Sequence, residues 1–356
     1  MQKQKVRVLI VDDSALMRQM LTTMLNSDPD IDVVGTASDP IVARRKIKEL
    51  QPDVVTLDIE MPNMDGLAFL EKIMALRPMP VVMVSSLTQM GAEATIRALE
   101  IGAVDFVSKP TEDLVTNFSA LSTEICVKVK MAAKIKVAAR RSAPRPAIDH
   151  LPSGRRFETT ERIVAIGAST GGVEALRHII STLPADAPAI LITQHMPPKY
   201  TASFARRLND ISSVTIYEAR DGQRVLPGHV YMAPGGRHLE LCRSGANYVC
   251  RLQDEAPLSG HRPSVDVLFN SVAQAAGANA MGIILTGMGR DGASGLLSMR
   301  RAGALTVGQD EASSIVYGMP KVAFETGAVG VQLPIELIAE QIVGVGLEDG
   351  ARRIRV

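Results

Sequence analysis

The 356-residue sequence lacks a regular cysteine pattern, an excess of charge of either sign, and internal repeats. Its three cysteines, Cys126, Cys242 and Cys250, are odd in number and lack metal-ligand spacing, so they predict neither a disulfide framework nor a zinc site. The formal net charge is +1, which does not indicate nucleic acid as a partner.

Long hydrophobic runs are also missing. No stretch of about 18 apolar residues occurs, and the apolar run near the N-terminus is too short for a signal peptide. We therefore expect a cytoplasmic protein that does not insert into a membrane. Hydrophobic residues make up 46% and charged residues 22%, as in folded globular proteins, and the length predicts two domains.

The first part of the chain alternates short β-branched runs with segments of helical period, from Val6 to about Pro110. Strand-helix units of this length predict an α/β domain, a doubly wound parallel sheet with helices on both faces. We place this domain at residues 1–122. A helical and then proline-rich segment follows and predicts a linker over residues 123–160.

The alternation returns in the second part, which predicts a second doubly wound parallel sheet over residues 161–350. The middle of this domain, residues 214–252, has short alternating runs separated by Asp221-Gly222 and Pro234-Gly235-Gly236. Such turn pairs are typical of β-hairpins, so we expect hairpins inserted in the sheet domain.

Acidic residues follow two candidate strands of the first domain. Asp12 and Asp13 come after VRVLIV, and Asp58 comes after DVVTL. The carboxyl ends of parallel strands share one edge of the sheet, where three carboxylates favour a magnesium ion among them. Ser85 and Lys109 end two further strands and add a hydroxyl and a cation at this edge. Any one of these acids could be a solvated strand-end residue, but all five side chains together indicate a phosphoryl site.

The pattern resembles the response-regulator receiver family over about the first 110 residues, on the residues Asp12-Asp13, Asp58, Ser85 and Lys109-Pro110 with MPNMDG after Asp58. The resemblance implies a flavodoxin-like receiver in which Asp58 accepts a phosphoryl group from a histidine kinase. It also implies that Phe106 reports the phosphorylation state through its rotamer.

The same resemblance implies roles for the other strand-end residues. Asp12, Asp13 and Asp58 would hold Mg²⁺, the cofactor of phosphorylation. Ser85 and Lys109 would contact the phosphoryl oxygens.

A glycine-rich turn, GASTGG at residues 167–172, follows the first strand of the second domain and opens a helix. A G-x-S-x-G turn in this position exposes the serine hydroxyl at the sheet edge, next to free backbone N–H groups at the helix start. Ser169 is therefore a candidate nucleophile. The alternative is a phosphate- or dinucleotide-binding turn, although G-x-G-x-x-G is not matched.

A serine nucleophile requires a neighbouring base, and histidine is the most common one. His150 lies in the linker, His178 inside a helix, and His229 and His238 in the hairpin region. His195 ends the strand AILITQH, on the same sheet edge as Ser169, and is the candidate base.

Asp291 completes the candidate triad because it follows the strand MGIIL and opens a helix. A carboxylate there can orient the imidazole of His195. The alternative role is an N-cap of the helix that it precedes. The order Ser169, His195, Asp291 differs from the Ser, Asp, His order of α/β-hydrolases, so we predict a Rossmann-like sheet.

The motifs IGASTGG, ITQHMPP, HRPSVDVLF and LTGMGRDG resemble the chemotaxis protein-glutamate methylesterase family. The resemblance implies that Ser169 attacks glutamate methyl esters of chemoreceptors with His195 as base and Asp291 as orienting group, that methanol leaves, and that receptor glutamines are deamidated. It implies backbone donors near Thr170 and Met288 for the oxyanion and no cofactor in this domain. A covalent acyl-enzyme and a direct attack by water both remain open.

The resemblance also implies a gate, in which the unphosphorylated receiver covers the catalytic cleft and phosphorylation of Asp58 opens it. A response regulator with a DNA-binding output is the rival class. It would require a small basic helix-turn-helix after the linker, and the second half has no such cluster.

Overall fold

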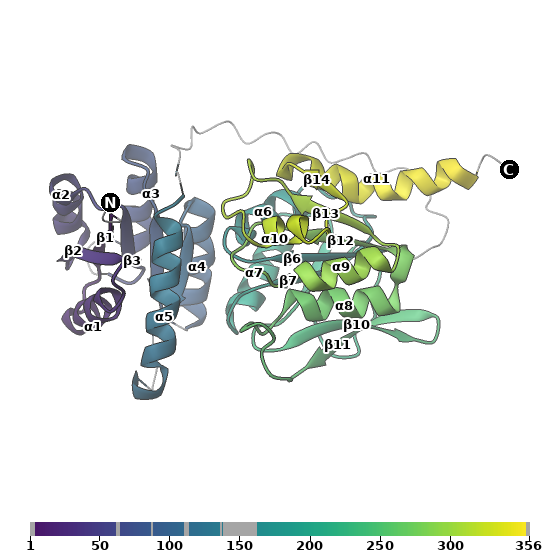
Figure 1. The fold of residues 1–356 in the computed structure, drawn as a ribbon, viewed down its shortest axis with the longest axis horizontal. Helices are drawn as coiled ribbons and strands as arrows, with labels where there is room; N and C mark the ends of the chain where they lie inside the picture. Colours follow the sequence, from purple (N-terminus) through teal and green to yellow (C-terminus); the bar gives the residue numbers. More distant parts are fainter. Residues whose placement is uncertain are drawn as a thin grey trace. The chain divides into compact units, whose positions relative to one another are not determined.

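We describe the chain from a computed structural model, which covers residues 4–61, 65–86, 88–109, 114–135, 137 and 162–353. The chain divides into two compact units, Met1–Pro144 and Arg145–Val356 (Figure 1). Among the described residues, no helix combines the length and the hydropathy that a membrane span requires. Of the expected linker, residues 136 and 138–160 lie outside the described residues.

The first unit is built from five strands that alternate with helices. In chain order these are β1 (Val6–Val11), α1 (Ala15–Asn26), β2 (Ile31–Ala37), α2 (Pro40–Leu50), β3 (Val54–Asp58), α3 (Gly66–Leu76), β4 (Val81–Ser85), α4 (Gln89–Ile101), β5 (Asp105–Ser108) and α5 (Leu114–Ala132). All strand pairs are parallel and the sheet order is β2-β1-β3-β4-β5, which confirms the flavodoxin-like prediction.

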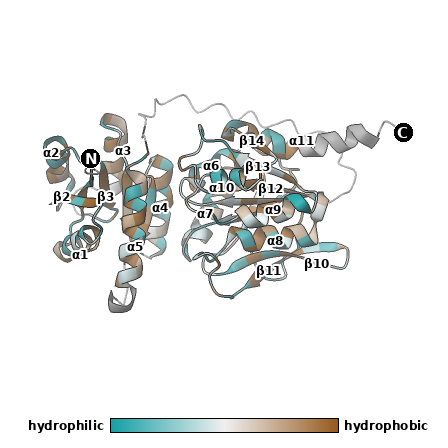
Figure 2. Cartoon of the chain, in the orientation of Figure 1, coloured by the Kyte–Doolittle hydropathy of each residue, from teal (hydrophilic) through white to brown (hydrophobic). Residues whose placement is uncertain are grey.

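The central strands β3 and β4 are buried on both faces, the edge strand β2 is only partly buried, and the helices have a buried and an exposed side. In α4, for example, Ala92, Ile96 and Leu99 are buried while other positions face solvent. Figure 2 accordingly shows both hydrophobic and hydrophilic residues along this helix. This arrangement leaves the carboxyl ends of the strands as the edge where polar side chains gather.

The boundary expected after residue 122 falls inside α5. Ile125, Val129 and Ala132 are fully buried in the core of the first unit, together with residues of β1 and α1. The first ten residues assigned to the linker (123–132) therefore belong to the first unit, because α5 needs its last turns to cover the sheet.

The second unit contains nine strands and six α-helices in its described part. They are β6 (Ile163–Ala168), α6 (Gly172–Ile180), β7 (Ala189–Gln194), α7 (Tyr200–Asn209), β8 (Thr215–Glu218), β9 (His229–Met232), β10 (His238–Ser244), β11 (Asn247–Gln253), α8 (Val265–Ala275), the 3₁₀ turn η1 (Gly277–Asn279), β12 (Ala280–Ile284), α9 (Ala293–Arg301), β13 (Leu305–Gln309), α10 (Met319–Glu325), β14 (Val331–Leu333) and α11 (Ile335–Arg353).

Seven of these strands form one parallel sheet in the order β14-β13-β12-β6-β7-β9-β8. The order is that of a Rossmann sheet with β9 added between β7 and β8, which confirms the predicted class. The strand order reverses at β6, because β7 lies on one side of it and β12 on the other. Ligands of such sheets bind at the carboxyl ends of the strands near this switch point.

The prediction of several hairpins between residues 214 and 252 is partly wrong. β8 and β9 are parallel strands of the main sheet, and the loop between them pairs with β11 through bonds such as Val225 N–H to Tyr248 O at 2.9 Å. Within residues 214–252, all of which are described, only β10 and β11 form a hairpin, which turns at Gly245 rather than at either predicted turn pair. Short alternating runs do not reveal whether a strand pairs in parallel or antiparallel.

Candidate functional sites

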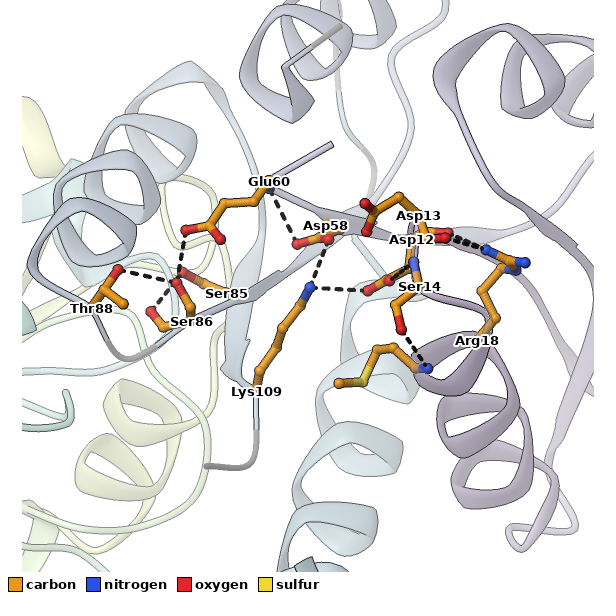
Figure 3. A network of polar contacts seen from close by, with 11 residues as sticks. Asp12, Asp13, Ser14, Arg18, Asp58, Glu60, Ser85, Ser86, Thr88 and Lys109 are labelled. Atoms are coloured by element: carbon orange, nitrogen blue, oxygen red, sulfur yellow. Dashed lines mark hydrogen bonds and ion pairs between the residues drawn. The ribbon is translucent and has the colours of Figure 1, made fainter. Parts of the chain in front are cut away.

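Three carboxylates meet at the carboxyl edge of the first sheet, as predicted. Asp12 and Asp13 directly follow β1, Asp58 is the last residue of β3, and oxygen atoms of the three lie within 4.8 Å of one another. Figure 3 shows the side chain of Lys109 between Asp58 and Asp12. Its Nζ lies 2.6 Å from Asp58 Oδ2 and 3.2 Å from Asp12 Oδ2.

Burial and repulsion raise the pKa of two of these carboxyl groups, Asp58 and Asp12. Burial raises the pKa of Asp58 to about 6, with the charge of Asp12 adding to the rise and the ammonium of Lys109 opposing it. Burial likewise raises the pKa of Asp12. The cluster is therefore short of positive charge even with one lysine present.

The residues present fit Mg²⁺. The metal prefers carboxylate oxygens and water, and the buried Oδ2 atom of Asp12 has only the ion pair with Lys109, at 3.2 Å, among the described residues. Asp12, Asp13 and Asp58 are the residues that would hold the ion, and Asp13 is exposed enough to leave room for water.

Ser85 is the last residue of β4, and Phe106 lies within β5. The buried hydroxyl of Ser85 donates to Gly91 O at 3.2 Å and accepts from Thr95 Oγ1 at 2.7 Å. The ring of Phe106 is buried, and Lys128 Nζ lies 5.2 Å from its centroid. A contact between Ser85 and a phosphoryl group thus requires its hydroxyl to leave its present partners.

The motif MPNMDG lies partly outside the described residues, at positions 62–64. Its Asp65 accepts a hydrogen bond from Leu67 N–H at 3.1 Å and so caps α3. This is a structural role for a residue that the sequence pattern associated with phosphorylation.

In the second unit, Ser169 stands directly after β6, in the turn that leads into α6. Its backbone N–H donates to Thr286 O at 3.1 Å, and its carbonyl accepts from Gln194 Nε2 at 2.9 Å. A Cβ atom at Gly172 would lie 2.0 Å from Gln194 Oε1, so only glycine fits beneath this turn. The turn is therefore tied to both neighbouring strand ends.

His195 follows β7 at the position equivalent to Ser169. Ala168 and Gln194 are paired in the parallel ladder, and the N–H of His195 donates to Ala168 O at 3.1 Å. The imidazole Nε2 lies 2.8 Å from Asp291 Oδ2, so the structure brings this pair together.

The other ring nitrogen of His195, Nδ1, is buried and has no hydrogen-bond partner among the described residues. The hydroxyl of Ser169 is therefore not bonded to His195 in this structure. Because Nε2 is occupied by Asp291, Nδ1 is the atom left to accept a proton. Catalytic hydrogen bonds of this kind are often long in the absence of substrate.

Asp291 is buried and accepts four hydrogen bonds. Besides His195, its donors are the hydroxyl of Ser264 at 2.8 Å and the backbone N–H groups of Val265 at 2.7 Å and Asp266 at 3.1 Å. Burial acts to raise the pKa of Asp291, but the hydrogen bond and charge of His195, with Val265 and Ser264, outweigh it and lower the pKa to about 2. The carboxylate is thus held charged and in one orientation.

The alternative N-cap role of Asp291 is fulfilled on a different helix from the one considered. Asp291 precedes α9, whose N-cap residue, Gly292, has no side chain with which to cap it. Its carboxylate instead binds the first N–H groups of α8, at Val265 and Asp266. One carboxylate therefore both caps a helix and orients His195.

Thr170 and Met288, the predicted oxyanion donors, lie on the two loops beside Ser169. The carbonyl of Thr170 accepts from Thr286 Oγ1 at 3.0 Å, which joins the loops. A Cβ atom at Gly287, the residue before Met288, would lie 2.8 Å from Ser169 Cβ. Donation from their N–H groups to substrate stays a prediction.

The sequence reasoning missed residues that support the site from the motif HRPSVDVLF. Ser264 donates to Asp291, and His261 stacks on His195 with ring centroids 3.8 Å apart. A signal was available, since a serine before the helical run VDVLF is a typical N-cap. No local pattern indicates that its hydroxyl contacts Asp291, 27 residues away.

Comparison with known protein families gives two matches. Residues 164–342 match the CheB methylesterase family, and residues 8–118 match the response regulator receiver domain. The two matches correspond to the two units of the structure.

Curated relatives extend over nearly the whole chain. A protein-glutamate methylesterase/protein-glutamine glutaminase of Xanthomonas campestris is 55% identical over 350 residues, which are 96% of this chain and 98% of the relative. One from Pectobacterium atrosepticum is 56% identical over 341 residues, with 95% and 96% covered. The crystal structure of the Thermotoga maritima CheB methylesterase catalytic domain matches with a TM-score of 0.51 and 37% identity, over 52% of this chain and all (100%) of that one.

Proposed function

The chain belongs to the CheB methylesterase family, and we propose that it hydrolyses glutamate 5-O-methyl esters of chemoreceptors with Ser169, His195 and Asp291 as its catalytic residues. It is a phosphorylation-regulated hydrolase of bacterial chemotaxis, a methylesterase and glutamine deamidase. The observation that supports the choice of residues is the 2.8 Å contact between His195 Nε2 and Asp291, at the sheet edge where Ser169 also lies.

The reaction follows from these positions. The oxygen of Ser169 bonds to the ester carbonyl carbon while its proton passes to His195 Nδ1, and the imidazolium is stabilised by the charged Asp291. The proton then moves from Nδ1 to the methoxy oxygen as the C–O bond breaks, and methanol leaves. Water then attacks the acyl carbon and gives its proton to Nδ1. That proton passes to the oxygen of Ser169 as its bond to the acyl carbon breaks, which releases the glutamate. Backbone N–H groups of Thr170 and Met288 would stabilise the oxyanion.

Deamidation of glutamine uses the same steps, with ammonia as the leaving group. Ester and primary amide pass through similar tetrahedral intermediates, so one set of donors serves both. The catalytic unit needs no cofactor for this chemistry.

The receiver unit would be phosphorylated on Asp58 by a chemotaxis histidine kinase. When bound by Asp12, Asp13 and Asp58, Mg²⁺ supplies charge neutralisation for the incoming phosphoryl group. Lys109 already contacts Asp58 and would contact the phosphoryl oxygens, with Ser85.

The test measures methanol released from methylated receptor membranes by the intact chain, with and without a small phosphodonor. We expect release that the phosphodonor increases. A serine-directed fluorophosphonate should label Ser169 and stop the release. Labelling elsewhere, or methanol release that survives full labelling, would contradict the serine mechanism and favour a phosphate-binding role for the turn.

A further inference from the structure

His261 lies flat on the imidazole of His195. The ring centroids are 3.8 Å apart and the ring planes differ by 6°. At this separation the two faces are in van der Waals contact. His195 itself is almost enclosed, with 8% of its side chain exposed.

The chain holds His261 in place through a tight turn. Leu258 and His261 exchange two backbone hydrogen bonds, at 3.1 Å and 3.0 Å, and the intervening Ser259 and Gly260 have φ values of 54° and 83°. This is the two-residue turn that joins antiparallel strands. Three residues later, Ser264 is bonded to Asp291, so the segment is anchored within the site.

The imidazole of His195 is thus held by two perpendicular contacts. Asp291 binds its Nε2 edge, and His261 covers one face. A single hydrogen bond lets a ring rock about the bond axis, whereas a stacked neighbour fixes the ring plane. Together the two contacts fix the direction in which Nδ1 points. This atom is buried and has no hydrogen-bond partner among the described residues.

We propose that His261 is a positioning residue of the esterase reaction: it fixes the plane of the His195 ring so that Nδ1 is aimed at the hydroxyl of Ser169. Its ring also offers an aromatic face to the imidazolium that forms when Nδ1 takes the proton of Ser169. This inference rests on the proposed function and adds a residue to it.

The test compares His261→Ala with His261→Phe, which keeps a flat ring. We measure kcat and KM for methanol release from methylated receptor membranes by the full chain with phosphodonor, and the rate of Ser169 labelling by a fluorophosphonate. His261→Ala should lower kcat and the labelling rate by about threefold to tenfold, the size of one aromatic stacking contact, with KM unchanged. His261→Phe should recover most of the loss.

His229→Ala is the matched control. His229 is also a partly buried histidine stacked on an aromatic ring, Tyr217, at 5.9 Å, but it begins β9 and so lies at the opposite end of the sheet from Ser169. Its loss should leave both rates at the wild-type value. A general effect of removing a stacked histidine would appear equally in this control.

The outcomes separate this inference from the proposed function. Wild-type kcat and labelling in His261→Ala would overturn the positioning role while leaving the esterase intact. A His261→Phe variant as slow as His261→Ala would overturn stacking as the cause. Were the wild type to release no methanol, the proposed function would fail, and the labelling rates would still decide the role of His261. Should His261→Ala not fold, His261→Gln, polar and without a ring, takes its place.

Discussion

Asp291 caps the helix that carries Asp266, and Asp266 in turn caps the helix that follows Asp291. Asp291, just before α9, accepts the N–H groups of Val265 and Asp266 in the first turn of α8. Asp266, in that turn, accepts the N–H of Gly295 in the first turn of α9 at 2.6 Å. The position of the Asp291 carboxylate is therefore coupled to the packing of two helices.

The pKa values of the two carboxyl groups shift in opposite directions because their surroundings differ. Burial, and then the charge of Asp291, raise the pKa of Asp266, whereas His195 and its other donors lower the pKa of Asp291 to about 2. A raised folded-state pKa means that the folded chain binds this proton more tightly than the unfolded chain. The contribution of Asp266 to stability therefore falls as pH rises above its ordinary pKa near 4.

Replacing Asp266 tests this coupling. Asp266→Ala removes the cap of α9 and should lower the free energy of unfolding of the second unit by about 1–2 kcal/mol. It should also reduce kcat, because α9, which Asp291 precedes, is then held less firmly against α8. Asp266→Asn keeps an acceptor oxygen and should be more stable than Asp266→Ala at pH 7. Urea denaturation and methanol release measure both effects. Asp254→Ala, an exposed carboxylate paired with Arg237, is the control and should change neither.

The nucleophile and base should act as a unit. Ser169→Ala and His195→Ala should each lower the rate of methanol release by about 10⁴-fold or more, with the fold retained. Asp291→Asn should be less severe in kcat, although it also weakens the cap of α8. Ser298→Ala on α9, whose hydroxyl bonds only within its helix, should have no effect. Substantial turnover by Ser169→Ala would exclude the serine mechanism.

The phosphoryl acceptor is tested by labelling with a phosphodonor. Asp58→Asn keeps the shape of the side chain but removes the nucleophilic carboxylate, so labelling should disappear. Lys109→Arg should allow labelling while uncoupling it from activation. Asp39→Asn, which replaces the N-cap of α2 by another good cap, should label at the wild-type rate. Labelling of Asp58→Asn at that rate would place the acceptor elsewhere.

The raised pKa of Asp58 predicts how the stability of the receiver depends on pH. The folded state keeps a proton up to about pH 6, whereas the ordinary value is 3.8, so without metal the stability should fall as pH rises between these values. Mg²⁺ binds the charged form and should restore the stability above this range. Thermal melting of the receiver unit with and without Mg²⁺ measures this. In Asp58→Asn both the fall in stability with pH and the effect of Mg²⁺ should be much smaller. An unchanged pH dependence of stability would assign it to Asp12 instead.

The gate implied by the family is tested by truncation. A chain that starts near Glu158 should release methanol faster than the unphosphorylated full chain and should not respond to phosphodonor. The full chain should respond. The two demethylation rates are measured at equal protein concentration. A truncated chain no faster than the unphosphorylated full chain would rule out inhibition by the receiver and leave it as an activator only.

The sequence alone determined the two doubly wound sheets and the strand ends on which Asp58, Ser169, His195 and Asp291 lie. These features depend on strand and helix periods and on turn residues, which act over a few positions along the chain. In an open parallel sheet the strand ends share one edge, so residues that follow different strands are brought to the same place by the fold class itself.

Only the tertiary structure decided how those residues are held. That β8 pairs in parallel with β9, that Asp291 caps α8 and not α9, and that His261 covers His195 each depend on the packing of separate segments. His195 and Asp291 are 96 positions apart, and nothing in the local period of either segment specifies which ring nitrogen meets which oxygen. Such contacts are selected by burial, because a buried carboxylate or imidazole is stable only where the whole fold supplies its partners.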